Sequence, residues 1–137
     1  MKNKLILIAL FVFSATYLFP IIKMNLGEYD EGVILAGADR IIKGHVPYTD
    51  FWALYPPGQF YTLAILFDTF GSSLLVARIY DIATKALIPI LGFLIARKLQ
   101  FSTKIALVTW GMLLVWVDYS GSTLYPVYPS ILLILTG

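Results

Sequence analysis

The stretch from residue 28 to residue 71, EYDEGVILAGADRIIKGHVPYTDFWALYPPGQFYTLAILFDTFG, decides how the rest of the chain is arranged. It is a polar segment between apolar ones. It carries six of the eight acidic residues, namely Glu28, Asp30, Glu31, Asp39, Asp50 and Asp68. The runs on either side have the composition of membrane-spanning segments. The sequence therefore predicts a carboxylate-rich loop at a membrane surface, where it can bind a ligand or carry out chemistry.

The composition is that of an integral membrane protein. The 137 residues are 59% hydrophobic and 13% charged, whereas soluble domains are about 45–50% apolar and about 25% charged. The net charge of +2 and the lack of a basic cluster argue against a nucleic-acid partner. There is no cysteine and the single histidine is His45, so thiolate and histidine-rich metal sites are excluded.

Four apolar runs predict an all-α, polytopic helix bundle in the membrane. They cover about residues 5–22, 72–96, 101–117 and 130–137. A crossing takes roughly 20 residues, so the last run is too short, and we expect the sequence to be the N-terminal part of a longer protein. The first run also fits a cleaved signal peptide, but its apolar stretch continues past a loosely fitting cleavage site, which favours an uncleaved anchor.

Basic residues predict the orientation of these spans. Lys2 and Lys4 precede the first run, and Arg97, Lys98 and Lys104 surround the turn between the second and third runs. All five lie on the cytoplasmic side if residues 59–70 do not cross the bilayer, as the positive-inside rule requires. We therefore expect a multi-pass cell-membrane protein with a cytoplasmic N-terminus and an external loop over residues 23–71.

The external loop is expected to contain an amphipathic juxtamembrane helix. Apolar residues recur at a spacing of three to four from Glu31 to about Lys43, with Asp30 as the cap and Gly44 as the end. Such a helix suits the membrane surface. Its solvated face would carry Asp39, Arg40 and Lys43.

A second, shorter helix is predicted over residues 59–70, started by Pro56-Pro57 and ended by Gly71. Twelve residues reach only about 18 Å, so this helix is expected to enter one leaflet or to pack along other helices. In the connection before it, Asp50 is expected to cap or bend the turn. An aromatic belt at the headgroup level is expected from Tyr48, Phe51, Trp52 and Tyr55.

The doublet Asp30-Glu31, which follows Tyr29, is the most distinctive candidate site. Adjacent carboxylates just after a membrane span can act as a general base or hold a divalent cation. They can equally be a helix cap followed by a favourable first-turn acid. Both interpretations stay open from the residues alone, and one does not exclude the other.

A second constellation lies within the run at 72–96. Arg78, Asp81 and Lys85 are spaced so that all three share one face of a helix. Arg78 is expected to extend to the outer surface, whereas Lys85 lies deeper and needs Asp81 or another partner. The stripe is either an ion-paired packing surface between helices or a cationic site for an anionic group such as a lipid phosphate.

Taken together, the motifs resemble a known family. Asp30-Glu31, ADRIIKG at 38–44, VPYTDFW at 46–52, YPPGQFY at 55–61 and FGSS at 70–73 followed by Arg78 are similar to the first external loop of GT-C glycosyltransferases. The branch resembled is that of the family 39 and ArnT-like enzymes, which includes the dolichyl-phosphate-mannose protein mannosyltransferases. The resemblance covers residues 1–137.

The resemblance implies a multi-span enzyme that transfers a sugar from a polyprenyl-phosphate donor to a glycan, lipid or protein acceptor at the outer membrane face. It places Asp30 at the catalytic centre with Glu31 beside it, and Arg78 or Lys85 near the donor phosphate. Tyr55 stands where the ArnT-like branch has a basic residue inferred to contact that phosphate. A further acidic residue of the family, in the next external loop, is replaced here by Tyr128-Pro129, with Asp118 the only nearby carboxylate. A need for a divalent metal is left open.

Two other functions fit the same residues. The chain can belong to a transporter or channel that uses Arg78, Asp81 and Lys85 as a polar pathway. It can also be a non-catalytic membrane assembly or lipid-binding subunit with the same scaffold.

Overall fold

The regular secondary structure of the described residues is helical, with turns between the helices. The computed structural model describes residues 2–24, 30–119 and 127–136, and within these its only strand-like feature is an isolated bridge between Pro47 and Phe51. The helices are α1 (Lys2–Leu18), the 3-10 helix η1 (Phe19–Lys23), α2 (Asp30–Ile42), α3 (Pro57–Phe70), α4 (Leu74–Lys98), α5 (Thr103–Tyr119) and α6 (Val127–Thr136). The all-α prediction is confirmed for these residues.

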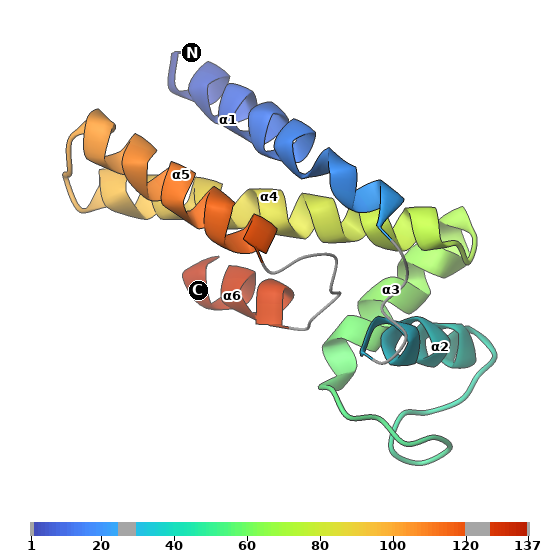
Figure 1. Cartoon of the computed structure of the whole chain (residues 1–137). Helices are drawn as coiled ribbons and strands as arrows, with labels where there is room; N and C mark the ends of the chain where they lie inside the picture. The colour runs from blue at the N-terminus through green and yellow to red at the C-terminus, as the bar shows by residue number, and fades with distance from the viewer. Residues whose placement is uncertain (1, 25–29, 120–126, 137) are drawn as a thin grey trace.

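Helix α4 is the element against which the others pack. It contacts α1, η1, α3, α5 and α6, and Figure 1 shows α1 and α5 running along it. The Ser73 side chain caps its first turn by accepting a hydrogen bond from the Val76 backbone N–H at 3.3 Å. The helix continues through the buried Pro89 and ends at Arg97 and Lys98, basic residues that favour a helix C-terminus.

Two helical stretches are long and apolar enough to cross a membrane. They are Lys4–Lys23, with 20 residues, and Leu74–Lys98, with 25 residues. At 1.5 Å per residue they reach about 30 Å and about 37 Å, which matches or exceeds the hydrocarbon core of a bilayer. They correspond to the first two predicted spans, whereas α5, the third, has 17 residues.

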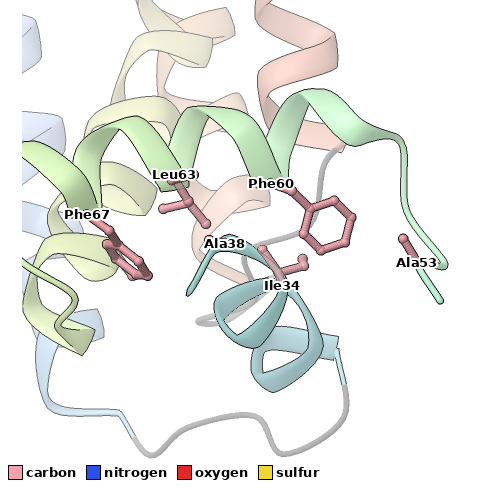
Figure 2. Close-up of a cluster of buried hydrophobic side chains, with 8 residues drawn as sticks. Ile34, Ala38, Ala53, Phe60, Leu63 and Phe67 are labelled. Carbon is pink, nitrogen blue, oxygen red and sulfur yellow. The ribbon is translucent and has the colours of Figure 1, made fainter. Parts of the chain in front are cut away.

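Helices α2 and α3 pack against each other and form a small core that also includes Ala77 of α4. Ile34 and Ala38 of α2 meet Phe60, Leu63 and Phe67 of α3, as Figure 2 shows. The approach is close at Gly37, where an added Cβ would lie 2.5 Å from the ring of Phe60. A helix is therefore confirmed over these residues, but its apolar face is covered by α3, and its place at the membrane surface stays a prediction.

A second core joins the long helices. Its fully buried members come from α1, η1, α4, α5 and α6, and they are Leu18, Ile21, Ile82, Ala86, Ile88, Leu114, Val117 and Tyr128. Ser14 of α1 accepts a hydrogen bond from the indole N–H of Trp110 in α5 at 3.1 Å. This bond satisfies two polar groups between otherwise apolar surfaces.

The turn residues act as their sequence predicts, with small shifts of the helix boundaries. Gly44 and Gly71 have φ of 87° and 90° and follow α2 and α3, a conformation that glycine adopts without strain. Helix α2 is described from Asp30, which lies in its first turn, and the capping role of Asp30 stays a prediction. Helix α3 has 14 residues and packs on α2 and α4, which fits one of its two predicted placements.

The predicted aromatic belt divides into two groups. Trp52 and Tyr48 are exposed, at 72% and 58%. Phe51 instead packs edge-on against Phe60, with ring centroids 6.3 Å apart, and Tyr55 is half-buried. The belt prediction was therefore wrong for Phe51 and Tyr55, because these two rings complete the core beneath the connection between α2 and α3. Glu28, Tyr29 and most of the second polar loop, residues 120–126, lie outside the described residues.

Candidate functional site

A buried ion pair joins α2 to α4. Both guanidinium NH groups of Arg78 face the carboxylate of Glu31, Nη1 towards Oε1 in a short contact and Nη2 towards Oε2 at 3.0 Å. Both side chains are 0% exposed. Nη2 of Arg78 also donates to the backbone carbonyl of Met24 at 3.3 Å. The expectation that Arg78 reaches out to the surface was wrong, because Glu31 offers it a bidentate partner inside the fold.

The ion pair links these two helices in addition to an apolar contact, since Ala77 of α4 lies in the same buried cluster as Ile34 and Ala38 of α2. Helix α2 makes its extensive contacts with α3, whereas α4 packs mainly on the other helices. Removing either partner of a buried ion pair strongly destabilises a protein, because the other charge then stays buried without compensation. Glu31 and Arg78 therefore help to fasten α2 to the long helix, which α3 also contacts.

A second buried pair continues along the same face of α4. Lys85 Nζ lies 3.0 Å from Asp81 Oδ2, with 0% and 2% of the two side chains exposed. Nζ also sits 4.8 Å from the ring centroid of Tyr128 in α6, the geometry of a cation–π contact. Asp81 additionally interacts electrostatically with Arg78 and Glu31. The predicted shared face and the predicted Asp81 partner of Lys85 are both confirmed.

The carboxylate of Asp30 has a different set of surroundings. Asp30 is half-buried in the first turn of α2, and the hydroxyl of Tyr55 donates a hydrogen bond to its Oδ1. The hydroxyl of Tyr48 in turn donates to the backbone carbonyl of Tyr55 at 2.6 Å. The two acids of the doublet thus have separate partners, as expected for consecutive residues, which point about 100° apart around a helix.

Metal-binding groups do not gather in the described residues. Over 2–24, 30–119 and 127–136, no three His, Cys, Asp or Glu side chains lie close enough together to hold an ion. The Glu31 carboxylate is bound by the guanidinium of Arg78 rather than by a metal ion. What the arrangement offers chemically is one partly accessible carboxylate, Asp30, beside a neutralised network of buried charges.

An apolar groove lies near this network. It has a volume of about 390 Å³ and is lined by residues of α3, α4 and α6, among them Thr62, Tyr80, Thr84 and Leu133. Gln59 accepts a hydrogen bond from the Tyr80 hydroxyl at 3.1 Å, so one polar cluster adjoins the groove. A larger groove of about 610 Å³ between α4, α5 and α6 is lined almost entirely by apolar side chains and contains none of the charged residues.

No protein-family model, curated protein or solved structure matches the chain. Any function therefore has to be argued from the residues themselves and from their geometry.

The predicted site residues fall into three groups. Glu31 and Arg78 come together, Lys85 joins Asp81, and Asp30 joins Tyr55. The expectation of a donor-phosphate contact at Tyr55 is untested, but the structure gives its hydroxyl another partner. Among the remaining predicted features, Asp39 forms an exposed pair with Lys43 at 2.6 Å, and Asp50 accepts from the backbone N–H of Val46 at 2.7 Å, as expected for a turn cap.

Sequence reasoning missed Tyr48 and Tyr128 as parts of the site. Tyr48 was assigned only to the interface, and the sole signal for another role is its place in the turn between Pro47 and Asp50. Tyr128 entered the sequence analysis only as a replacement for an acidic residue of the resembled family, whereas it lies 3% exposed against Lys85. No local pattern links Tyr128 to Lys85, since they meet only through the packing of α6 on α4.

Proposed function

We propose that the chain belongs to a multi-pass membrane glycosyltransferase of the GT-C type, with its N-terminus in the cytoplasm and the α2–α3 unit at the outer face. The observation that carries the proposal is the placement of Asp30. This half-buried residue accepts a hydrogen bond from Tyr55 in the first turn of a helix that the buried Glu31–Arg78 pair joins to α4, which is long and apolar enough to span a membrane. A fixed, partly accessible carboxylate is what a general base requires.

The substrates would be a polyprenyl-phosphate-linked sugar and an acceptor with a hydroxyl group, on a glycan, lipid or protein. The acceptor hydroxyl gives its proton to an oxygen of Asp30. An electron pair of the acceptor oxygen forms a bond to the anomeric carbon of the sugar. The bond from that carbon to the phosphate oxygen breaks, and the electron pair leaves with the polyprenyl phosphate. Asp30 assists by removing the proton as the oxygen attacks.

The roles first expected of Glu31, Arg78 and Lys85 change within this proposal. Glu31 serves to hold Arg78 rather than to act as a second base, because its carboxylate is fully buried and bound on both oxygens. Arg78 and Lys85 already face carboxylates, so a donor phosphate would contact them only after replacing Glu31 or Asp81. The apolar groove beside Tyr80 and Thr84, with leucines of α4 and α6 in its lining, suits a prenyl chain.

The test is sugar transfer by the full-length protein, purified and reconstituted with a panel of polyprenyl-phosphate sugars. We expect the wild type to form product and Asp30→Asn to lose at least 100-fold in rate, in line with the contribution of a general base. Asp68→Asn is the matched control, because Asp68 is an exposed acid on α3. Both variants should insert into the membrane like the wild type.

Three results would contradict the proposal. Normal turnover by Asp30→Asn would remove that carboxylate from the mechanism. Solute flux into proteoliposomes without any glycosylated product would indicate a transporter. A stable partner on pull-down, together with indifference to Asp30→Asn, would indicate an assembly subunit.

A further inference from the structure

The connection between α2 and α3 is a folded turn rather than a passive linker. The backbone N–H of Tyr48 donates to the carbonyl of Phe51 at 2.9 Å, and that of Asp50 donates to the carbonyl of Val46 at 2.9 Å. The carboxylate of Asp50 closes the turn on the Val46 N–H. Pro47 is buried beneath it. The turn therefore has enough internal bonds to hold a defined shape.

Tyr48 occupies a strained position in this turn. Its φ is +66°, in the left-handed region that L residues other than Asn, Asp and Gly seldom adopt. Such a conformation persists only where surrounding contacts offset its cost, and it often marks a functional constraint. Here the constraint is visible, because the Tyr48 hydroxyl reaches the backbone carbonyl of Tyr55 at 2.6 Å.

The next bond leads to the candidate base. Tyr55 lies just before Pro56 and the start of α3, and its hydroxyl donates to Oδ1 of Asp30, which is 25 residues away in the sequence. The side chain of Tyr48 thus holds the backbone of Tyr55, and the side chain of Tyr55 holds the carboxylate of Asp30. Two hydrogen bonds, made by the hydroxyls of Tyr48 and Tyr55, thus connect the turn after α2 to Oδ1 of Asp30.

We infer that Tyr55 is a positioning residue that orients the Asp30 carboxylate, and that Tyr48 supports it by fixing the backbone of Tyr55. This inference rests on the proposed function. A neutral hydroxyl donor holds the carboxylate in one rotamer and leaves its negative charge in place to accept a proton. A lysine at position 55 would instead neutralise Asp30 as an ion pair.

The inference differs from a phosphate-binding role for Tyr55 in what a substitution changes. A residue that orients the base alters the rate of the chemical step and leaves substrate binding nearly unchanged. A residue that contacts the donor phosphate alters donor binding. Small errors in the placement of a reacting group cost up to about 100-fold in rate.

The experiment measures kcat and the donor KM of the full-length protein for Tyr55→Phe and Tyr48→Phe, with Tyr61→Phe as the matched control on the exposed surface of α3. We expect Tyr55→Phe to lower kcat by about 10- to 100-fold with the donor KM within about twofold of the wild type. Tyr48→Phe should lower kcat in the same way but less, and Tyr61→Phe should match the wild type.

Melting temperatures in detergent supply a second readout that does not need activity. If the Tyr55 hydroxyl bonds to Asp30, the shift for the double variant Tyr55→Phe with Asp30→Ala will be smaller than the sum of the two single shifts, because alanine, unlike asparagine, leaves no oxygen to accept the bond. Additive shifts would overturn the inference. A raised donor KM with kcat retained would also overturn it, in favour of a phosphate contact.

The failure of the inference and that of the proposed function are distinguishable. If the wild type transfers sugar and Tyr55→Phe does so equally well, only the positioning role falls. If the wild type transfers no sugar from any donor in the panel, the proposed function falls and the positioning role falls with it.

Discussion

Replacing Arg78 with methionine is the change whose effect follows most directly from the buried charge network. Methionine keeps much of the length of the side chain but removes the guanidinium group. Glu31, which is 0% exposed, would then face the interior without its bidentate partner. Removing one member of a buried pair in this way costs about 3–5 kcal/mol. We expect the free energy of unfolding to fall by that amount.

The double variant separates the value of the pair from the cost of leaving one charge behind. Glu31→Leu combined with Arg78→Met removes both charges and fills the same space with apolar atoms. Replacements of this kind are often neutral or stabilising, so the double variant should be more stable than Arg78→Met alone. Because the two side chains are in direct contact, the effects of the single changes should not add.

The assay is equilibrium unfolding of the purified protein in detergent, followed by tryptophan fluorescence and repeated with Lys43→Met as the control. Lys43 also pairs with a carboxylate, but 66% of its side chain is exposed, so its loss should leave the unfolding free energy almost unchanged. A loss below about 1 kcal/mol for Arg78→Met would refute the reasoning, since a buried pair costs more than that to break. Additive single-variant effects would do so as well.

Two further changes test the packing around this network. Gly37→Ala should destabilise the protein by about 1–3 kcal/mol in the same assay, because the added Cβ would meet the buried ring of Phe60. Gly58→Ala is the control and should be neutral or slightly stabilising, because nothing lies within 4 Å of an added Cβ there. Equal effects of the two changes would contradict the close approach of α2 to α3. Lys85→Met should destabilise the protein by about 3–5 kcal/mol, because it leaves the buried Asp81 without its ion-pair partner. Adding Asp81→Leu to Lys85→Met should restore much of the lost stability. No recovery in this double variant would argue against the pair.

Features set by local chemistry could be predicted from the sequence. Gly44 and Gly71 end their helices because each takes a positive φ that other residues avoid. The pairing of Lys85 with Asp81 followed from their i, i+4 spacing on one helix, together with the cost of leaving either charge alone. The short length of α3 was likewise evident from the prolines before it and the glycine after it.

Contacts between distant residues could not be predicted in this way. Glu31 and Arg78 are 47 residues apart, and no periodicity connects a loop helix to the face of a later span. Tyr55 was assigned to an aromatic belt at the interface because it follows other aromatic residues in the loop, yet its hydroxyl donates to Asp30. The side chains of Arg78 and Tyr55 are both amphipathic, so the direction in which each points depends on which partner the tertiary packing brings near.

The most direct test of the central claim, that Asp30 works at the outer face, is cysteine labelling in intact cells. The chain has no cysteine, so His45→Cys in the exposed turn after α2 and Lys104→Cys near the start of α5 each provide a single thiol. With a membrane-impermeant maleimide, His45→Cys should be labelled in intact cells and Lys104→Cys only after permeabilisation. Labelling of His45→Cys only after permeabilisation would place Asp30 in the cytoplasm and contradict the claim.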